Sequence, residues 1–323
     1  SLNLKKNLAL KELECGANQL KSLDISANTM LSRLSCTSND MQKLTIGETS
    51  ALEELECSAN SLKSLDMGKS KLLKDLHCSS NKLTNLDVSG AGALEHLYCS
   101  ANKITSLNVK KNKALITLSC SDNALSSLNL SKNAALEDLN CSFNELGSLD
   151  VSINILLTEL YCSSNQIESL DLSMNTALTN LQCAVNQLTS LSLSANTMLT
   201  KLDCAANQLI EIDLSSNTAL EAFSCGSNHI QHLDLGLNTA LTSLDCSKNQ
   251  LTELNVSGNT ALKSLNCEKN RIENLDLYAN TALEELRCAN NKLTAIDVSA
   301  NTLLRFLNCD IDVIVDGYME DEA

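Results

Sequence analysis

The 323-residue sequence contains no proline and no tryptophan, and aromatic residues make up only 2% of it. Without proline there is no proline-rich linker to separate domains, and the ten glycines are dispersed along the chain. So few aromatic side chains cannot build the core of a conventional globular domain. The interior must therefore be made of other residues.

Positive charge and long apolar runs are also scarce. The chain has 24 Lys and Arg against 39 Asp and Glu, a net charge of −15. Nucleic-acid binding relies on cations that neutralise phosphate, so we expect no nucleic-acid partner. No segment approaches the roughly 18 apolar residues of a transmembrane helix, and no signal peptide is visible, so we expect no membrane insertion. The chain opens inside a repeat without an initiator Met, and we expect it to be cut from a longer protein.

What the sequence does contain is a cysteine at every 21st position. The series begins at Cys15 and Cys36 and continues without insertion or deletion to Cys309, giving 15 cysteines in all. Internal repeats of this length are typical of solenoids, in which each repeat buries its apolar edge only by stacking on its neighbours. The period therefore predicts one elongated repeat domain.

Each repeat consists of two similar halves. In the repeat that spans 220–240, the first half places Leu220, Phe223 and Cys225 ahead of Asn228, and the second half carries Leu233-Asp234-Leu235 ahead of Asn238. The alternation of apolar and polar residues is typical of strands, and no segment has the length and pattern of an amphipathic helix. We therefore predict a mostly β solenoid of 15 repeats, with little helix and two parallel sheets of short strands. Its predicted parts are a half repeat at 1–9, fourteen repeats over 10–303, and a degenerate repeat with an acidic cap or tail at 304–323.

The regular cysteines and asparagines are interpreted as structural. Cysteine is a small buried hydrophobe, and a linear ladder of equivalent thiols neither converges on a metal nor singles out a nucleophile. We expect no metal, no cofactor and no disulfide ladder. An inward asparagine offers two donors and an acceptor to backbone groups at tight turns. It occupies one position in 14 of the 15 repeats, from Asn18 to Asn291.

The pattern Leu-x-x-Leu-x-Cys-x-x-Asn-x-Leu resembles the leucine-rich repeat, with Cys where Leu is commonest. Its second half, Leu-x-x-Leu-Asp-Leu-x-x-Asn, is similar to the bacterial 21-residue nested-periodicity class, also called IRREKO. The resemblance implies a right-handed superhelix whose Leu-x-x-Leu-x-Cys sheet forms the recognition face. It also implies a non-catalytic protein-binding or adhesion module, secreted or at the surface of a bacterium. Free thiols are typical of reducing compartments, which leaves the cytoplasm open.

Candidate contact residues are the large side chains at outward positions of the first sheet. Exposed aromatic residues near the centre of a face are typical binding anchors, and half of the protein's Tyr and His lie within about five neighbouring repeats. The candidates, together with acidic neighbours that would steer a basic protein partner, are His77, His96, Tyr98, Phe143, Tyr161, Asp75, Glu95, Asp138 and Glu159.

The sequence is also consistent with two functions other than protein binding. A spacer or stalk would hold another domain away from the cell and would need no contact residues. An enzyme is the remote alternative, because the chain has four His and no Ser-His-Asp or glycine-rich phosphate motif.

Overall fold

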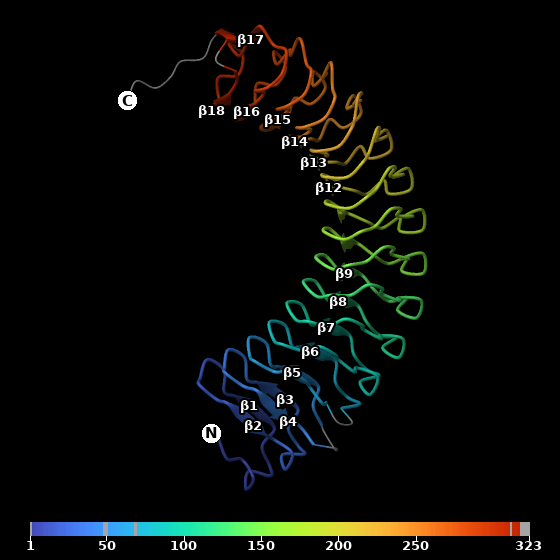
Figure 1. Ribbon diagram of the computed structural model, residues 1–323, viewed down its shortest axis with the longest axis vertical. Coiled ribbons are helices and arrows are strands. Elements are labelled where there is room, and N and C mark those ends of the chain that lie inside the picture. Colours follow the sequence, from blue (N-terminus) through green and yellow to red (C-terminus); the bar gives the residue numbers. More distant parts are fainter. Residues whose placement is uncertain (1, 48–50, 68–69, 311, 317–323) are drawn as a thin grey trace, which may run out of the picture. The chain divides into compact units, whose positions relative to one another are not determined.

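The computed structural model describes residues 2–47, 51–67, 70–310 and 312–316. The chain divides into two compact units, Ser1–Gln166 and Ile167–Ala323. Within each unit the backbone winds through successive coils of one repeat each (Figure 1). The acidic tail predicted after Asp316 lies outside the described residues, and the predicted domain boundaries stay predictions.

In the first unit, eight short strands form a parallel sheet in the order β1-β3-β5-β6-β7-β8-β9-β10, and β2 pairs separately with β4. Its strands within the described residues are β1 (Glu12–Glu14), β2 (Ser22–Asp24), β3 (Arg33–Ser35), β4 (Lys43–Thr45), β5 (Glu54–Glu56), β6 (Asp75–His77), β7 (His96–Tyr98), β8 (Thr117–Ser119), β9 (Asp138–Asn140) and β10 (Glu159–Tyr161).

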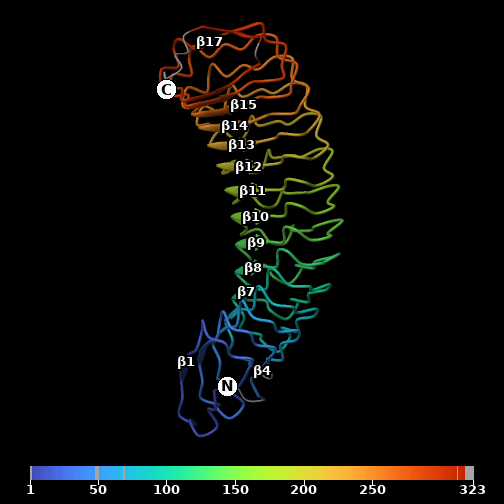
Figure 2. The same ribbon diagram turned by 60° about the vertical axis from the view of Figure 1, so that its left-hand side comes forward.

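In the second unit, seven strands form a parallel sheet in the order β11-β12-β13-β14-β15-β16-β18, and β17 pairs with β19. Its strands within the described residues are β11 (Asn180–Gln182), β12 (Lys201–Asp203), β13 (Ala222–Ser224), β14 (Ser243–Asp245), β15 (Ser264–Asn266), β16 (Glu285–Arg287), β17 (Ala295–Asp297), β18 (Phe306–Asn308) and β19 (Ile314–Asp316). Figure 2 shows the strands of each unit along one side of its coils.

The main sheets form because the first half of each repeat alternates between inward and outward side chains. Leu76 at the centre of β6 has no exposed surface, and neither has Cys78 just after it, whereas Asp75 and His77 face outward and are half-buried. Adjacent strands pair in parallel at a step of one repeat, as in Asp75 with His96. Every strand therefore contributes the same positions to the core, which confirms the leucine-rich repeat solenoid predicted from the sequence.

The expected second sheet is present only in part. In the second halves, β2 pairs with β4 and β17 with β19, and an isolated bridge joins Leu86 to Leu107. The other second halves of the described chain run through turns instead. The reason is a different way of joining repeats: the Asn133 side chain donates through Nδ2 to Val109 O at 3.0 Å and Asn112 O at 2.8 Å of the preceding repeat. Here a side chain makes the bonds that backbone amides make in a sheet.

The asparagine ladder of the first halves is structural, as its position predicted. Asn144 Nδ2 donates to Cys120 O of the preceding repeat at 3.0 Å and to Cys141 O of its own repeat at 3.1 Å. Its Oδ1 accepts from Leu125 N of the preceding repeat at 3.0 Å. One buried side chain therefore binds the turn of its own repeat to the turn of its neighbour.

The residue before each asparagine of this ladder has a left-handed backbone conformation. The φ angles lie between 51° and 59°, and none of these residues is glycine. The positions are Ala17, Ser38, Ala59, Ser80, Ala101, Asp122, Phe143, Ser164, Val185, Ala206, Ser227, Lys248, Lys269 and Asn290. A residue with a Cβ is less stable in this conformation by about 1–2 kcal/mol, and a β-branched residue is the least suited to it.

We therefore expect Val185→Gly to stabilise the protein by about 1 kcal/mol, because glycine adopts φ near 56° without the Cβ penalty. Little burial is lost, since Val185 is 52% exposed. Urea unfolding followed by circular dichroism measures the change. The matched control is Ala184→Gly at the preceding position, where φ is not left-handed and the substitution is expected to cost about 0.5–1 kcal/mol. Equal effects at both positions would count against stored backbone strain.

All fifteen cysteines are free, and thirteen of them are buried. Only Cys15 and Cys309, in the first and last repeats, retain partial exposure. Burial raises the pKa of Cys57 and of Cys120 to about 12. The thiols therefore remain protonated and pack as small apolar groups, in agreement with the interpretation of the ladder as core.

Candidate functional surface

The predicted contact residues lie on the outward face of the first unit's sheet, on strands β6, β7, β9 and β10 or directly beside them. Asp75 and His77 belong to β6, and His96 and Tyr98 to β7. Asp138 begins β9, and Glu159 and Tyr161 begin and end β10. We call this set, with Glu95 and Phe143, the sheet-face cluster. Its role in binding remains a prediction, while its placement follows from the strand register.

The centre of the sheet-face cluster is a stacked ring pair. His77 and Tyr98 occupy equivalent positions on β6 and β7, and their ring centroids lie 4.4 Å apart at an interplanar angle of 20°. His96 lies on β7 opposite Asp75, and its Nδ1 is buried without a hydrogen-bond partner among the described residues. The two stacked rings therefore lie on the outward face of the sheet, with the His96 imidazole on one of the same two strands.

The second part of the cluster lies on β9 and β10, beyond Thr117–Ser119 of β8. Tyr161 donates its hydroxyl hydrogen to Glu159 Oε2, which fixes the ring on the face. Asp138 pairs in register with Glu159. Burial raises the pKa of the Asp138 carboxyl, and the negative charge of Glu159 raises it further. Two carboxylates therefore repel each other on adjacent strands.

Phe143 is the most exposed aromatic residue of the cluster. Its side chain is 61% exposed, and its φ is 55°. Both properties are unfavourable for a phenylalanine in a free protein, because the ring contacts water and the Cβ strains the backbone. A partner that covers the ring would recover the first of these costs.

The whole outward face of the first unit has an excess of negative charge. Ten carboxylates lie on it against Lys11, Arg33 and Lys74. Two of these cations are engaged in ion pairs: Arg33 Nε lies 3.1 Å from Glu54 Oε2, and Lys74 Nζ lies 3.9 Å from Glu53 Oε2. The ten carboxylates are Glu12, Glu14, Glu53, Glu54, Glu56, Asp75, Glu95, Glu137, Asp138 and Glu159.

Chemical sites are not evident in the part of the chain that the structure describes. Its His, Cys, Asp and Glu side chains nowhere gather in a group of three that could hold a metal ion. In the same residues, no helix combines the length and hydropathy needed to cross a membrane.

The structure adds a feature that the sequence reasoning missed. A hollow of about 200 Å³ lies over β11 to β14 of the second unit, where Ala222, Ser224 and Ser243 are the outward side chains at its centre. The only signal in the sequence is a run of small residues at equivalent positions of neighbouring repeats.

Comparison with known proteins identifies the family of the chain. No protein-family model matches it, and no curated protein does. Among solved structures, the functional domain of InlJ from Listeria monocytogenes, which also includes a cysteine ladder, is 37% identical with a TM-score of 0.88, over 92% of this chain and 68% of that one. The leucine-rich repeat protein LIC12759 from Leptospira interrogans is 23% identical, with a TM-score of 0.82 over 97% and 86% of the two chains.

An internalin, InlF from Listeria monocytogenes str. 4b F2365, has the same fold at 20% identity, with a TM-score of 0.67 over 98% of this chain and 89% of that one. At this identity, the likeness to InlF and to LIC12759 concerns the fold alone. The likeness to InlJ extends to the sequence and to the cysteine ladder. The chain therefore belongs to the leucine-rich repeat proteins, in the bacterial class with 21-residue repeats.

Proposed function

We propose that this chain is a non-catalytic protein-binding module that contacts its partner through the sheet-face cluster of the first unit. The observation that supports the proposal most is the placement of exposed and half-exposed aromatic side chains on a regular sheet face, in a protein whose aromatic content is 2%. Large aromatic side chains that become buried dominate the energetics of most protein interfaces.

The charge of the face supports a basic protein partner. The free carboxylates outnumber the cations, and the raised pKa of the Asp138 carboxyl reflects burial first and then repulsion by Glu159. A partner with Lys or Arg side chains would relieve this repulsion and be steered to the face at low ionic strength. We further propose that the module acts outside a bacterial cell, in adhesion to a host or envelope protein, on the basis of the family resemblance.

The test compares the wild type with a variant carrying Tyr98→Ala, Phe143→Ala and Tyr161→Ala in pull-downs from host-cell surface proteins and bacterial envelope extract. We expect the variant to lose a partner that the wild type retains, since truncating buried aromatic anchors costs about 2 kcal/mol or more each. The purified partner is then measured by calorimetry at two salt concentrations, and binding should weaken as salt rises.

A matched control substitutes three exposed side chains of the second unit outside its sheet, Leu237→Ala, Tyr278→Ala and Leu303→Ala. It should bind like the wild type. Circular dichroism must show that all three proteins are folded. If the control variant loses the partner and the sheet-face variant retains it, the proposed surface is wrong. Absence of any partner for the wild type would favour a spacer or stalk.

A further inference from the structure

The hollow of the second unit is a second candidate site, distinct from the sheet-face cluster. Its floor is formed by the small outward side chains of β13 and β14, Ala222, Ser224 and Ser243, above the buried ring of Phe223. Because these side chains are short, the longer ones of neighbouring strands stand around them as a rim. The rim residues are Asn180, Gln182, Lys201, Asp203 and Asp245.

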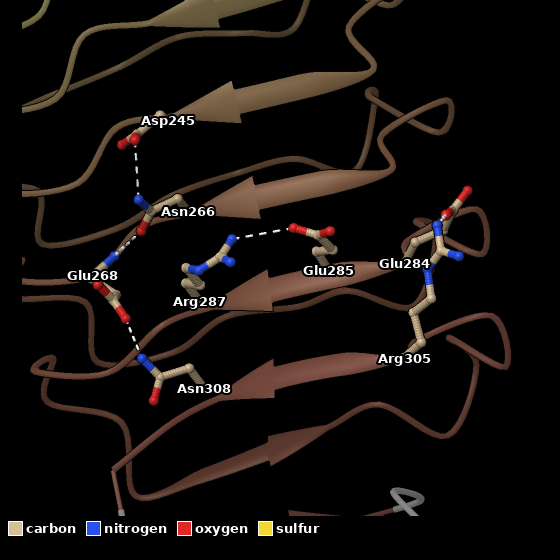
Figure 3. Close-up of polar contacts among 8 residues, drawn as sticks. All are labelled: Asp245, Asn266, Glu268, Glu284, Glu285, Arg287, Arg305 and Asn308. Atoms are coloured by element: carbon tan, nitrogen blue, oxygen red, sulfur yellow. Dashed lines mark hydrogen bonds and ion pairs between the residues drawn. The ribbon is translucent and has the colours of Figure 1, made fainter.

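The two carboxylates on the rim are held in place by local hydrogen bonds. Asp203 Oδ1 accepts from Ala205 N at 3.1 Å, and Asp245 Oδ1 accepts from Ser247 N at 2.9 Å. Asp245 Oδ2 also accepts from Asn266 Nδ2 at 3.0 Å. Figure 3 shows this contact and its continuation from Asn266 through Glu268 to Asn308. An ionised carboxylate offers about four acceptor positions, so each retains capacity for a ligand.

The hollow has unneutralised negative charge. Neither Asp203 nor Asp245 forms an ion pair with any residue that the structure describes, and Lys201 offsets only one of the two charges. The negative charges of both aspartates also act on the Cys225 thiol, which is buried after the end of β13. Burial raises the pKa of this thiol most, neighbouring thiols raise it further, and Asp245 and Asp203 add to the effect. A cation in the hollow would find two oriented acceptors, neither of which forms an ion pair with a residue that the structure describes.

The spacing of the carboxylates selects the kind of cation. Asp203 and Asp245 occupy equivalent positions on β12 and β14, with β13 between them. Parallel strands lie about 4.8 Å apart, so the two backbones are separated by roughly 9.6 Å. A guanidinium group has five N–H donors in a planar fork and can bond to acceptors on opposite sides, whereas an ammonium group is compact.

We propose that this hollow receives the guanidinium group of an arginine from a partner protein, with Asp203 and Asp245 as bridging acceptors. The inference extends the proposed function to a second point of contact. Because its test uses a small probe, the two proposals can fail separately.

The test is saturation-transfer NMR at low ionic strength with N-acetyl-L-arginine amide, and with the neutral N-acetyl-L-citrulline amide as the matched probe. We expect transfer to the arginine derivative and little to the citrulline derivative. The Asp203→Asn, Asp245→Asn double variant should weaken binding about tenfold, because charge-assisted hydrogen bonds are lost. Ser224→Leu, which fills the hollow without changing its charge, should have a similar effect.

The control is Glu145→Gln with Glu168→Gln, which removes two exposed carboxylates that lie outside the sheets and changes the net charge equally. It should leave binding of the arginine derivative unchanged. Equal binding of both probes, equal loss in both double variants, or no transfer at a probe concentration of about 20 mM would each overturn the proposal. Melting curves establish that every variant is folded.

Discussion

Raising the pH above 9 in the presence of a reductant is expected to unfold the protein over a narrow pH range. Burial raises the pKa of twelve of the buried thiols above the ordinary value of 9.0, six in each unit. Neighbouring thiols or carboxylates add to the effect in most cases. The twelve are Cys36, Cys57, Cys78, Cys99, Cys120, Cys141, Cys183, Cys204, Cys225, Cys246, Cys267 and Cys288.

The direction of the effect follows from proton linkage. Below pH 9 both the folded and the unfolded chain retain their thiol protons, so the stabilising contribution is complete. Above pH 9 the unfolded chain releases protons that the folded chain still holds, and the free energy of unfolding falls. Each thiol contributes about 1.4 kcal/mol per pH unit until its folded-state pKa is reached, which for Cys57 is about 12.

The expected slope is steep because many thiols titrate together. Six thiols in one unit lower its free energy of unfolding by about 8 kcal/mol per pH unit. Domains are usually stable by about 5–15 kcal/mol, so each unit should unfold within about two pH units above 9. Urea unfolding at closely spaced pH values, followed by circular dichroism, measures the slope.

A variant with Cys57→Ala and Cys120→Ala provides the control. It should be less stable at pH 7 because packing is lost, but its slope above pH 9 should be smaller than that of the wild type by two thiols. Equal stability at pH 8 and pH 10.5 would show that the thiols are not the buried protonated groups described here.

The second large effect is expected at the asparagine ladder. Replacement of Asn144 by alanine removes the acceptor for Leu125 N and the donor for Cys120 O, and both of these groups lie inside the fold. A buried backbone group left without a partner costs about 1–3 kcal/mol. We therefore expect Asn144→Ala to lower the free energy of unfolding by roughly 3–5 kcal/mol.

Urea unfolding at pH 7 measures this loss. Asn85→Ala is the matched control, because Asn85 is an exposed asparagine of the same unit, and surface substitutions usually change stability by less than about 0.5 kcal/mol. Asn144→Asp should be at least as harmful as Asn144→Ala, since an oxygen would face the carbonyl oxygens of Cys120 and Cys141. A loss below 1 kcal/mol for Asn144→Ala would mean that water replaces the amide.

The main sheets could be predicted from the sequence because their cause is local. The alternation around Leu76 and Cys78 fixes which side chains turn inward, and the constant repeat length fixes the register between strands. The extent of the second sheet could not be predicted, because the second halves have strand-like residues but most of their repeats are joined by asparagine side chains such as Asn133. Residue types indicate that a polar side chain is turned inward, but not which backbone groups it will satisfy.

Of the candidate surfaces, too, one part could be predicted from the sequence and another could not. The stacking of His77 on Tyr98 follows from their equivalent positions in adjacent repeats, which the sequence already shows. The hollow beside Ala222 depends on side chains that are absent from the face, and small residues carry no motif. The left-handed backbone of Phe143 was also beyond sequence reasoning, because thirteen other residues of several types share this conformation.

The asparagine bonds have a consequence for how such a protein changes over generations. Asn144 and its equivalents bond only within their own repeat and to the repeat before it, so no bond in the ladder depends on how many repeats there are. A stretch of gene that encodes one whole repeat can be copied or lost without leaving a broken contact at the junction. Such an event moves one row of outward side chains relative to the next, and thus rearranges the exposed face of the sheet while the scaffold beneath it is inherited unchanged.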